Sequence, residues 1–323
     1  MISIVIPCFN EETVLPQIYT RLSAVAPTWG GDYEILLVDD GSTDRTWEQI
    51  RSFHCKDARW KGIRLARNFG QQAALGAGLQ LAQGNALIFL DADLQDPPEL
   101  IAEFIARWQG GAEVVYGIRA ERPEGRLKQM CYAGFYWLLV RSSRTPLPAG
   151  AGDFGLVDRK VVRVLRACKE QRPFWRGLRG YVGFKQVGVP YSRYSRQAGS
   201  AQYTLKKLLQ LASDGFWSLT TLPLDLLTAI AVLATLVVLL AGSWVLPGER
   251  LGLGVWVGLI LGCVNLFGLA VMGRYLARVY DEVRRRPRWI IADRVGFGKS
   301  TRRRQDVRAA GHSSPAVGPT SYS

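Results

Sequence analysis

The sequence predicts an α/β fold with a mostly parallel sheet, followed by two apolar helices near the C-terminal end. Three observations support this prediction. In the first 120 residues, short apolar runs alternate with helical stretches, which is the pattern of βαβ units. Polar clusters follow several of these runs, at the carboxyl ends of strands where open α/β sheets bind ligands. Finally, 226–246 and 252–273 are free of charged residues, and each has about the 20 residues that cross a bilayer.

The strands and helices of the α/β part are read from these runs in chain order. Five short apolar runs are predicted strands: 2–6, 33–38, 63–66, 86–90 and 113–116. Four segments between or after them are predicted helices: 10–26, one beginning near 42–44, 71–82 and 97–108. Pro97 and Pro98 suit a first helical turn, where no backbone N–H is needed. A further strand-like run, 152–160, carries Asp153.

The stretch after the predicted strand 86–90 has an unusual density of polar groups. It carries three carboxylates and one carboxamide: Asp91, Asp93, Gln95 and Asp96. Carboxylates this close raise one another's pKa values unless a cation or a donor lies between them. A hard divalent cation takes oxygen ligands and completes its shell with water and substrate phosphate. The stretch therefore predicts a metal–diphosphate site, and the alternative is a solvated turn before a helix.

The composition narrows the classes of partner and of chemistry. The chain has 323 residues, a net charge of +14 and a pI of about 9.8. This balance favours an anionic partner, namely nucleic acid, anionic lipid or a phosphorylated substrate. Nucleic acid is not favoured, because the basic residues do not gather on one helix face. With only two histidines, His54 and His312, zinc sites and Ser–His–Asp catalysis are not expected, so acid–base work falls to carboxylates.

The cysteines and the N-terminus indicate a cytoplasmic setting for the first part of the chain. Five cysteines are scattered without a C-x-x-C motif, which is typical of free thiols in a reducing compartment. The first seven residues lack the basic start of a signal peptide, and their apolar run is too short for one. We therefore expect the amino-terminal region to stay in the cytoplasm.

Apolar segments in the second half of the chain predict membrane contact. Two segments are predicted to lie in a membrane interface, because one follows basic residues (127–140) and the other has basic residues near its start (203–219). For 127–140, a helix of the protein core is an equal alternative. The spans 226–246 and 252–273 are joined by only 247–250, which predicts a helical hairpin; the alternative is a soluble bundle. Basic residues on the outer flanks predict that both termini are cytoplasmic.

Several motifs together resemble the inverting family 2 glycosyltransferases with a GT-A fold. These motifs are Ser3–Glu12, Val38–Asp44, Arg67–Gly70 and Asp91–Pro98. Within the family, the chain resembles the polyprenyl-phosphate glycosyltransferases, which include dolichol-phosphate mannose synthase and bacterial undecaprenyl-phosphate glucosyltransferases. Further segments match this subgroup: 152–154, 176–178, 214–215 and 274–280. The resemblance covers roughly residues 2–295.

The resemblance implies an enzyme that moves a sugar from a nucleotide diphosphate sugar to a polyprenyl phosphate. Glucose, UDP and undecaprenyl phosphate are the default sugar, nucleotide and acceptor, with Mg²⁺ or Mn²⁺ as the cofactor. Mannose, an amino sugar and 4-amino-4-deoxyarabinose remain alternatives for the sugar. A homo-oligomer is left open, and nucleic acid is not an expected partner.

The resemblance also assigns roles to individual residues. The nucleotide-sugar residues it implies are Pro7, Glu11, Asp39, Asp91 and Asp93, with Asp39 on the uracil or ribose. The implied metal ligands are Asp91, Asp93 and Gln95. Arg119 and Arg126 are the implied ligands of the acceptor phosphate, and Asp153 and Asp93 the implied catalytic residues. A phosphate monoester is mostly ionised at neutral pH, so Asp153 is expected to orient sugar or acceptor more than to abstract a proton.

This resemblance and the apolar spans together predict five segments in an inner-membrane, multi-pass protein. They are a cytoplasmic GT-A domain over 1–202, an interfacial amphipathic helix over 203–222, a two-span transmembrane hairpin over 223–276, a cytoplasmic basic segment over 277–298 and a disordered tail over 299–323. At 199–203, Gly-Ser-Ala-Gln-Tyr replaces the subgroup's Gly-x-Ser-Lys-Tyr. The role of that loop, and the donor sugar with it, are therefore open.

Two rival functions share some of these features. A processive polysaccharide synthase would carry the same amino-terminal motifs, but it would also have a Gln-x-x-Arg-Trp motif and more spans. The nearest stretch here, 171–175, does not fit that motif. A non-enzymatic membrane adaptor with a degenerate transferase domain would not need all three predicted metal ligands.

Overall fold

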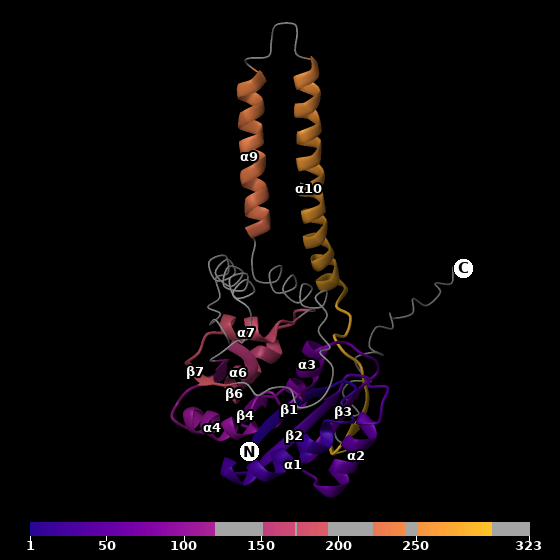
Figure 1. Ribbon diagram of the computed structural model, residues 1–323, viewed down its shortest axis with the longest axis vertical. Helices are drawn as coiled ribbons and strands as arrows, with labels where there is room; N and C mark the ends of the chain where they lie inside the picture. Colours follow the sequence, from indigo (N-terminus) through magenta and orange to yellow (C-terminus); the bar gives the residue numbers. More distant parts are fainter. Residues whose placement is uncertain (120–150, 172, 193–221, 243–250, 299–323) are drawn as a thin grey trace, which may run out of the picture.

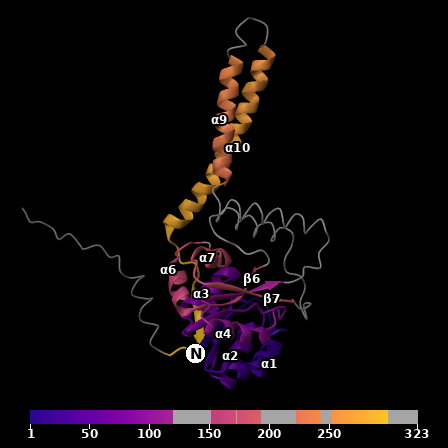
Figure 2. The ribbon, with the colours of Figure 1, turned by 90° about the vertical axis from the view of Figure 1, so that its left-hand side faces the viewer.

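An eight-stranded sheet forms the centre of the molecule, with helices on both faces and two long helices that project from it (Figures 1 and 2). The computed structural model describes residues 1–119, 151–171, 173–192, 222–242 and 251–298. The strand order is β7-β5-β6-β4-β1-β2-β3-β8. The strands are β1 (Ile2–Cys8), β2 (Tyr33–Asp39), β3 (Trp60–Leu65), β4 (Ala86–Phe89), β5 (Val114–Arg119), β6 (Ala151–Asp158), β7 (Gln186–Tyr191) and β8 (Ile291–Val295).

The direction of the strands makes the sheet mixed but mostly parallel, as predicted. The pairs β1–β2, β1–β4, β2–β3 and β5–β7 are parallel. Strand β6 runs antiparallel to both of its neighbours, β4 and β5. Strand β8 closes the far edge antiparallel to β3.

The helices cover both faces of the sheet. The α-helices near the sheet are α1 (Leu15–Val25), α2 (Thr46–Lys56), α3 (Gln71–Leu81), α4 (Ile101–Gln109), α6 (Arg159–Ala167) and α7 (Trp175–Tyr181). Short 3₁₀ helices are η1 (Ala26–Trp29) and η2 (Pro98–Leu100). Helices α1, α2 and α4 cover one face, and α3, α6 and α7 cover the other.

Two apolar cores follow from this arrangement, because side chains alternate between the faces of a strand. In β1, Ile4 and Ile6 pack under α1, α2 and α4, whereas Val5 packs under α3. Every residue of β1 and of β2 is buried. A strand that is buried on both faces reads as a continuous apolar run, which is why these two strands could be predicted so directly.

The helix that was predicted to begin at Asn10 begins at Leu15 instead. The reason is a set of hydrogen bonds between two loops at one end of the sheet. The backbone N–H groups of Asn10, Glu11 and Glu12 donate to side chains of Ser42, Thr46 and Asp44 respectively. These amides therefore belong to a loop–loop contact rather than to the first turn of a helix.

The C-terminal part contains two helices, α9 (Leu222–Gly242) and α10 (Leu251–Arg284), which lie side by side and lead away from the sheet (Figures 1 and 2). Among the residues that the structure describes, no helix meets the combined length and hydropathy of a membrane span. The predicted interfacial helix over 203–222 lies almost wholly outside the described residues, as do 127–140 and the tail 299–323. After α10 the chain returns to the sheet as β8, a strand that was not predicted.

Candidate active site

The predicted site residues gather at the end of the sheet where the carboxyl ends of its parallel strands lie, hereafter the site edge. Strands β1, β2, β4 and β5 run in the same direction, so their carboxyl ends share this edge. Pro7, Asp39 and Arg119 lie at or near the ends of β1, β2 and β5, and Asp91 follows β4. Strand β6 runs the opposite way, with Gly155 paired to Phe89. Asp153 therefore lies at the same edge, where the chain leaves β4.

Asp39 is fully buried at the end of β2. Its Oδ1 accepts a hydrogen bond of 2.9 Å from the Ser42 N–H, and its Oδ2 lies 3.4 Å from Arg64 Nε. Burial raises the pKa of this carboxyl above its ordinary value. Oδ2 has no hydrogen-bond partner among the described residues. Because a buried acceptor normally has a donor, Asp39 is suited to receive an N–H or O–H of a bound ligand.

Asp40, the next residue, organises the loop that leads into α3. Its two carboxylate oxygens accept hydrogen bonds of 2.8 Å from the N–H groups of Phe69 and Gly70. Gly41 has a φ of +70°, and a Cβ there would lie 2.5 Å from the Arg67 carbonyl carbon. The conformation at Gly41 and the two hydrogen bonds therefore fix the start of α3 at the site edge.

The acidic stretch after β4 divides into an accessible part and a buried part. Asp91, Asp93 and Gln95 are half-buried. Asp91 Oδ1 accepts from Gln71 Nε2 at 2.8 Å, and Asp93 Oδ1 accepts from the Gln95 N–H at 3.1 Å. Asp96 is fully buried, and its Oδ1 accepts a hydrogen bond of 2.5 Å from the Tyr191 hydroxyl. Asp96 is therefore occupied by a donor from β7, which relieves the crowding of charge inferred from the sequence.

The side-chain oxygens of the acidic stretch fit a divalent cation that shares its coordination shell with a substrate. Within the described ranges, no group of three or more His, Cys, Asp or Glu side chains is arranged to hold a metal ion. Asp91, Asp93 and Gln95 offer two carboxylates and one amide oxygen. Mg²⁺ is commonly held by one or two carboxylates, with water and substrate phosphates as its other ligands. This donor set therefore fits a cation that arrives with a diphosphate.

Asp153 lies in a cluster of arginines at the same edge. Its Oδ1 is 3.3 Å from Arg176 Nε, and its side chain is only 16% exposed. Burial by itself raises the pKa of Asp153, but the charges of Arg176, Arg179 and Arg119 outweigh it and hold this pKa below its ordinary value. Arg179 is buried, donates to the Gly152 carbonyl at 3.1 Å and has its pKa lowered to about 10 by desolvation. The cluster combines a fixed carboxylate with three guanidinium groups.

Arg119 is connected to the acidic stretch through Tyr191. Arg119 Nε donates to the Tyr191 hydroxyl at 3.5 Å, and that hydroxyl donates to Asp96. Burial, together with the charge of Asp96, raises the pKa of Tyr191, so the phenol stays protonated. Arg119 is thus the one predicted phosphate ligand that the structure places, because Arg126 lies outside the described residues.

We predict that Tyr191→Phe lowers the thermal stability of the protein. The substitution keeps the ring but removes one donor from the fully buried Asp96 carboxylate. Loss of such a partner costs about 1–3 kcal/mol, which corresponds to a drop in Tm of roughly several degrees. Differential scanning fluorimetry would measure it, with Tyr181→Phe as the control, because Tyr181 is 72% exposed. Equal Tm values for the two variants would show that the Tyr191–Asp96 bond contributes no net stability.

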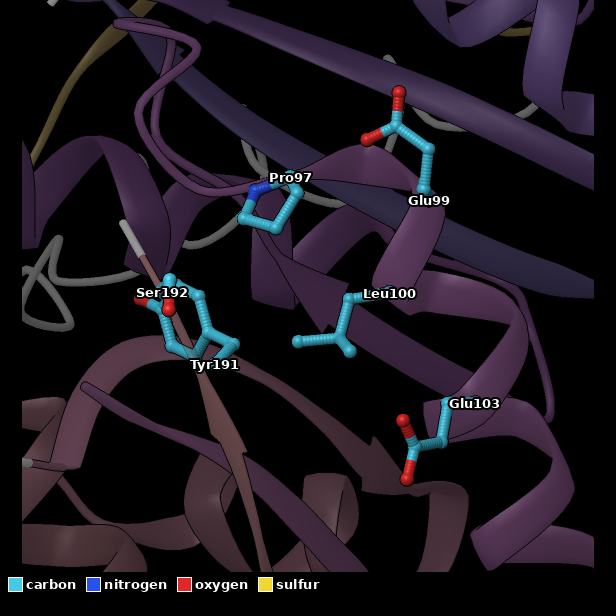
Figure 3. A pocket seen from close by; sticks show the side chains of 6 residues that line it. All are labelled: Pro97, Glu99, Leu100, Glu103, Tyr191 and Ser192. Carbon is cyan, nitrogen blue, oxygen red and sulfur yellow. The ribbon is translucent and has the colours of Figure 1, made fainter. Parts of the chain in front are cut away.

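A separate, open pocket of about 390 Å³ lies next to Tyr191 (Figure 3). It is lined by Pro97, Glu99, Leu100, Glu103, Tyr191 and Ser192. None of these lining residues is cationic, and each glutamate already pairs with an arginine, Glu99 with Arg21 and Glu103 with Arg107, so the pocket offers no cationic side chain of its own to a phosphate. The arginine cluster and the acidic stretch, rather than this pocket, therefore form the candidate active site.

Sequence reasoning did not assign roles to several residues of this site. Arg176 belongs to a segment that carried the resemblance, 176–178, but no role followed from it. Arg179, Tyr191 and Gln71 gave no signal of their own, because their partners come from other elements of the fold.

Comparison with known proteins identifies the family of the chain. Residues 3–166 match the glycosyl transferase family 2. The chain is 40% identical over 307 residues to the glycosyltransferase YkcC of Bacillus subtilis, covering 91% of this chain and 94% of that one. It is 36% identical over 300 residues to the SfII prophage-derived bactoprenol glucosyl transferase of Shigella flexneri, covering 90% and 97%.

Among solved structures, the mannosyltransferase PcManGT from Pyrobaculum calidifontis, in complex with GDP-Man and Mn²⁺, is 18% identical, with a TM-score of 0.42 and coverage of 62% and 58%. The family match and the identity to relatives over nine-tenths of the chain decide the assignment. The mostly parallel, mixed sheet is accordingly the GT-A fold that the resemblance implied. The chain belongs to glycosyl transferase family 2 and is a glycosyltransferase.

Proposed function

We propose that this enzyme transfers glucose from UDP-glucose to undecaprenyl phosphate at a membrane, with Mg²⁺ or Mn²⁺ held by Asp91, Asp93 and Gln95. The observation that carries the proposal is the placement of two unlike groups at one sheet edge. An accessible acidic loop follows β4, and an arginine cluster surrounds Asp153 on the adjacent β6. The similarity to bactoprenol glucosyl transferases supports glucose and the polyprenyl acceptor.

The acidic loop and the end of β2 form the donor half of the proposed site. The bound cation would neutralise the charge of the departing nucleotide diphosphate. Asp39 Oδ2, which lacks a hydrogen-bond partner within the described ranges, would accept from the uracil or the ribose. Pro7 and Glu11 lie on the adjacent strand end and loop, where they would line the nucleotide pocket.

The arginine cluster forms the acceptor half. A phosphate monoester has a second pKa near 6 and is mostly dianionic at neutral pH, so it attacks without prior loss of a proton. Arginine binds phosphate with two parallel N–H donors, and we propose that Arg119 binds the acceptor phosphate. Attack from the face opposite the nucleotide would invert the sugar carbon. Asp153, kept ionised by Arg176, would orient the sugar.

The membrane part of the proposal concerns α9 and α10. Several described side chains on these helices are apolar and highly exposed, among them Leu233, Leu266, Phe267 and Leu276. Large exposed apolar surfaces mark contacts with a membrane or a partner. We therefore propose that 226–246 and 252–273 cross the inner membrane as a hairpin, with the catalytic domain and both termini in the cytoplasm. Arginines at the end of α10 would contact anionic headgroups.

A donor panel would test the function directly. The full chain in detergent would be mixed with undecaprenyl phosphate, Mg²⁺ or Mn²⁺, and one radiolabelled nucleotide sugar at a time. We expect UDP-glucose to give one labelled glycolipid. A product with mannose, an amino sugar or 4-amino-4-deoxyarabinose would change the sugar but keep the reaction. Polymer formation would indicate a processive synthase, and the absence of transfer from every donor would contradict the proposal.

We predict that Arg119→Ala raises the KM for the lipid phosphate more than the KM for the nucleotide sugar. A hydrogen bond to a charged group contributes about 1.5–3 kcal/mol, so the expected rise is roughly 10- to 100-fold. Steady-state kinetics with each substrate varied in turn would measure it. Arg107→Ala is the control, because the Arg107 side chain is 58% exposed on α4. Equal effects on the two KM values would remove Arg119 from the acceptor half.

A further inference from the structure

The first turn of α3 contacts both halves of the candidate site. Gln71, the first residue of the helix, donates from Nε2 to Asp91 Oδ1 at 2.8 Å. Gln72 turns to the other side, where its Oε1 accepts from the Trp175 N–H at 3.1 Å and its carbonyl accepts from Trp175 Nε1 at 2.7 Å. Trp175 begins α7, the helix that carries Arg176 and Arg179. Two neighbouring glutamines thus reach the acidic loop and the arginine helix.

This turn is fixed by the residues before it. Gly70 has a φ of +97°, which other residues rarely adopt, and its N–H donates to Asp40. The N–H of Phe69 donates to the other oxygen of the same buried carboxylate. Gln71 therefore leaves the loop from a backbone that is held on both sides.

The body of α3 is fixed as well. A Cβ at Gly78 would lie 2.3 Å from Val5 Cγ1, so the helix packs directly against β1. A Cβ at Gly76 would lie 2.7 Å from the ring of Trp289 and 3.0 Å from that of Trp175. Because protein cores are closely packed, α3 cannot slide along the sheet without displacing these rings. The distance between Gln71 and the end of β4 is thus set by the fold.

We propose that Gln71 is a positioning residue that orients the Asp91 carboxylate for the divalent cation, and this inference rests on the proposed function. Carboxylates that bind metals are commonly held by a hydrogen bond from outside the ligand shell. The donor to Asp91 is the amide of Gln71, and an amide donates a hydrogen bond without carrying a charge. Asp153 is held by a charged arginine, whereas Asp91 receives this hydrogen bond from a neutral donor.

The test is the affinity for Mn²⁺ in the presence of UDP, measured on the full chain by electron paramagnetic resonance. Gln71→Met keeps the length and helix propensity of the side chain but removes the donor. We expect it to weaken Mn²⁺ binding by about 10-fold or more, with an unchanged Tm. Gln72→Met and Gln80→Met are matched controls on the same helix, since Gln72 contacts Trp175 and Gln80 is exposed. Both should bind Mn²⁺ as the wild type does.

The outcomes separate this inference from the function on which it rests. Wild-type affinity in Gln71→Met would overturn the inference even if the wild type transfers sugar. Equal weakening in all three variants would also overturn it, because the effect would then be a general one on α3. If the wild type binds Mn²⁺ with UDP but transfers no sugar to undecaprenyl phosphate, the proposed function fails while the role of Gln71 stands.

Discussion

Asp93→Ala should abolish most of the sugar transfer while the protein stays folded. Asp93 is half-buried, and its carboxylate accepts from the Gln95 N–H within the acidic loop itself. Loss of that bond costs only about 0.5–1.5 kcal/mol of stability. Loss of a metal ligand removes charge stabilisation of several kcal/mol from the transition state, or roughly a 10³-fold decrease in kcat/KM.

The measurement is initial-rate transfer with a saturating donor, at several Mn²⁺ or Mg²⁺ concentrations. Excess metal should not restore the rate, since the deficit lies in the ligand shell. Glu99→Ala serves as the control, because Glu99 is a nearby acid that is paired with Arg21 at 2.9 Å and is half exposed. Near-normal turnover of Asp93→Ala would mean that the metal assignment is wrong.

The same loop shows what sequence alone could and could not reveal. The carboxylates after β4 were visible because they interrupt a continuous apolar run, and the buried strands β1, β2 and β4 follow from similar runs. Strand β7 contains Gly188 and Pro190, and β8 is half polar at the sheet edge, so neither has the pattern of a buried strand. Their places depend on long-range pairing with β5 and β3.

The partners of the site residues are equally invisible in the sequence. Asp96 and Tyr191 are 95 positions apart, and Asp153 and Arg176 are 23 apart. The acids of this stretch stand out in the sequence by their density. Which of them accepts a hydrogen bond from a distant residue depends on the folded sheet. In the structure Asp96 is fully buried and takes the Tyr191 hydroxyl, whereas Asp91 and Asp93 are half-buried.

The two sides of the candidate site differ in charge. The acidic loop carries two half-buried carboxylates, one of which accepts a hydrogen bond from the Gln71 amide and the other from a backbone N–H, and carboxylate oxygens are ligands of divalent cations. At Asp153 the positive charges outnumber the carboxylate, so this side favours an anion. In the proposed reaction, a donor diphosphate with its cation and an acceptor phosphate would therefore approach the same sugar without repelling each other.

Asp153→Asn should reduce kcat by about 100-fold or more, because a small misplacement of the sugar is enough for such a loss. The direction of the pKa shift of Asp153 adds a prediction for the pH–rate profile. Arg176, Arg179 and Arg119 hold the pKa of Asp153 below its ordinary value, so the group is a carboxylate throughout the neutral range. The acid limb of the wild-type pH–rate profile should therefore follow the acceptor phosphate, with its second pKa near 6, and not Asp153.

Arg176→Gln would distinguish an orienting from a merely structural role for Asp153. Loss of Arg176 removes the largest of the charges that lower the pKa of Asp153, so this pKa rises. The acid limb should move to higher pH where the pKa of Asp153 passes that of the phosphate. A structural defect would lower the rate equally at every pH. The measurement is kcat from pH 5 to 9 for the wild type, Arg176→Gln and Asp153→Asn. The Asp153→Asn variant has no titrating group at position 153, so the acid limb of its profile should still follow the phosphate. If its acid limb moved to higher pH as that of Arg176→Gln does, Asp153 would not be the group that responds to the loss of Arg176.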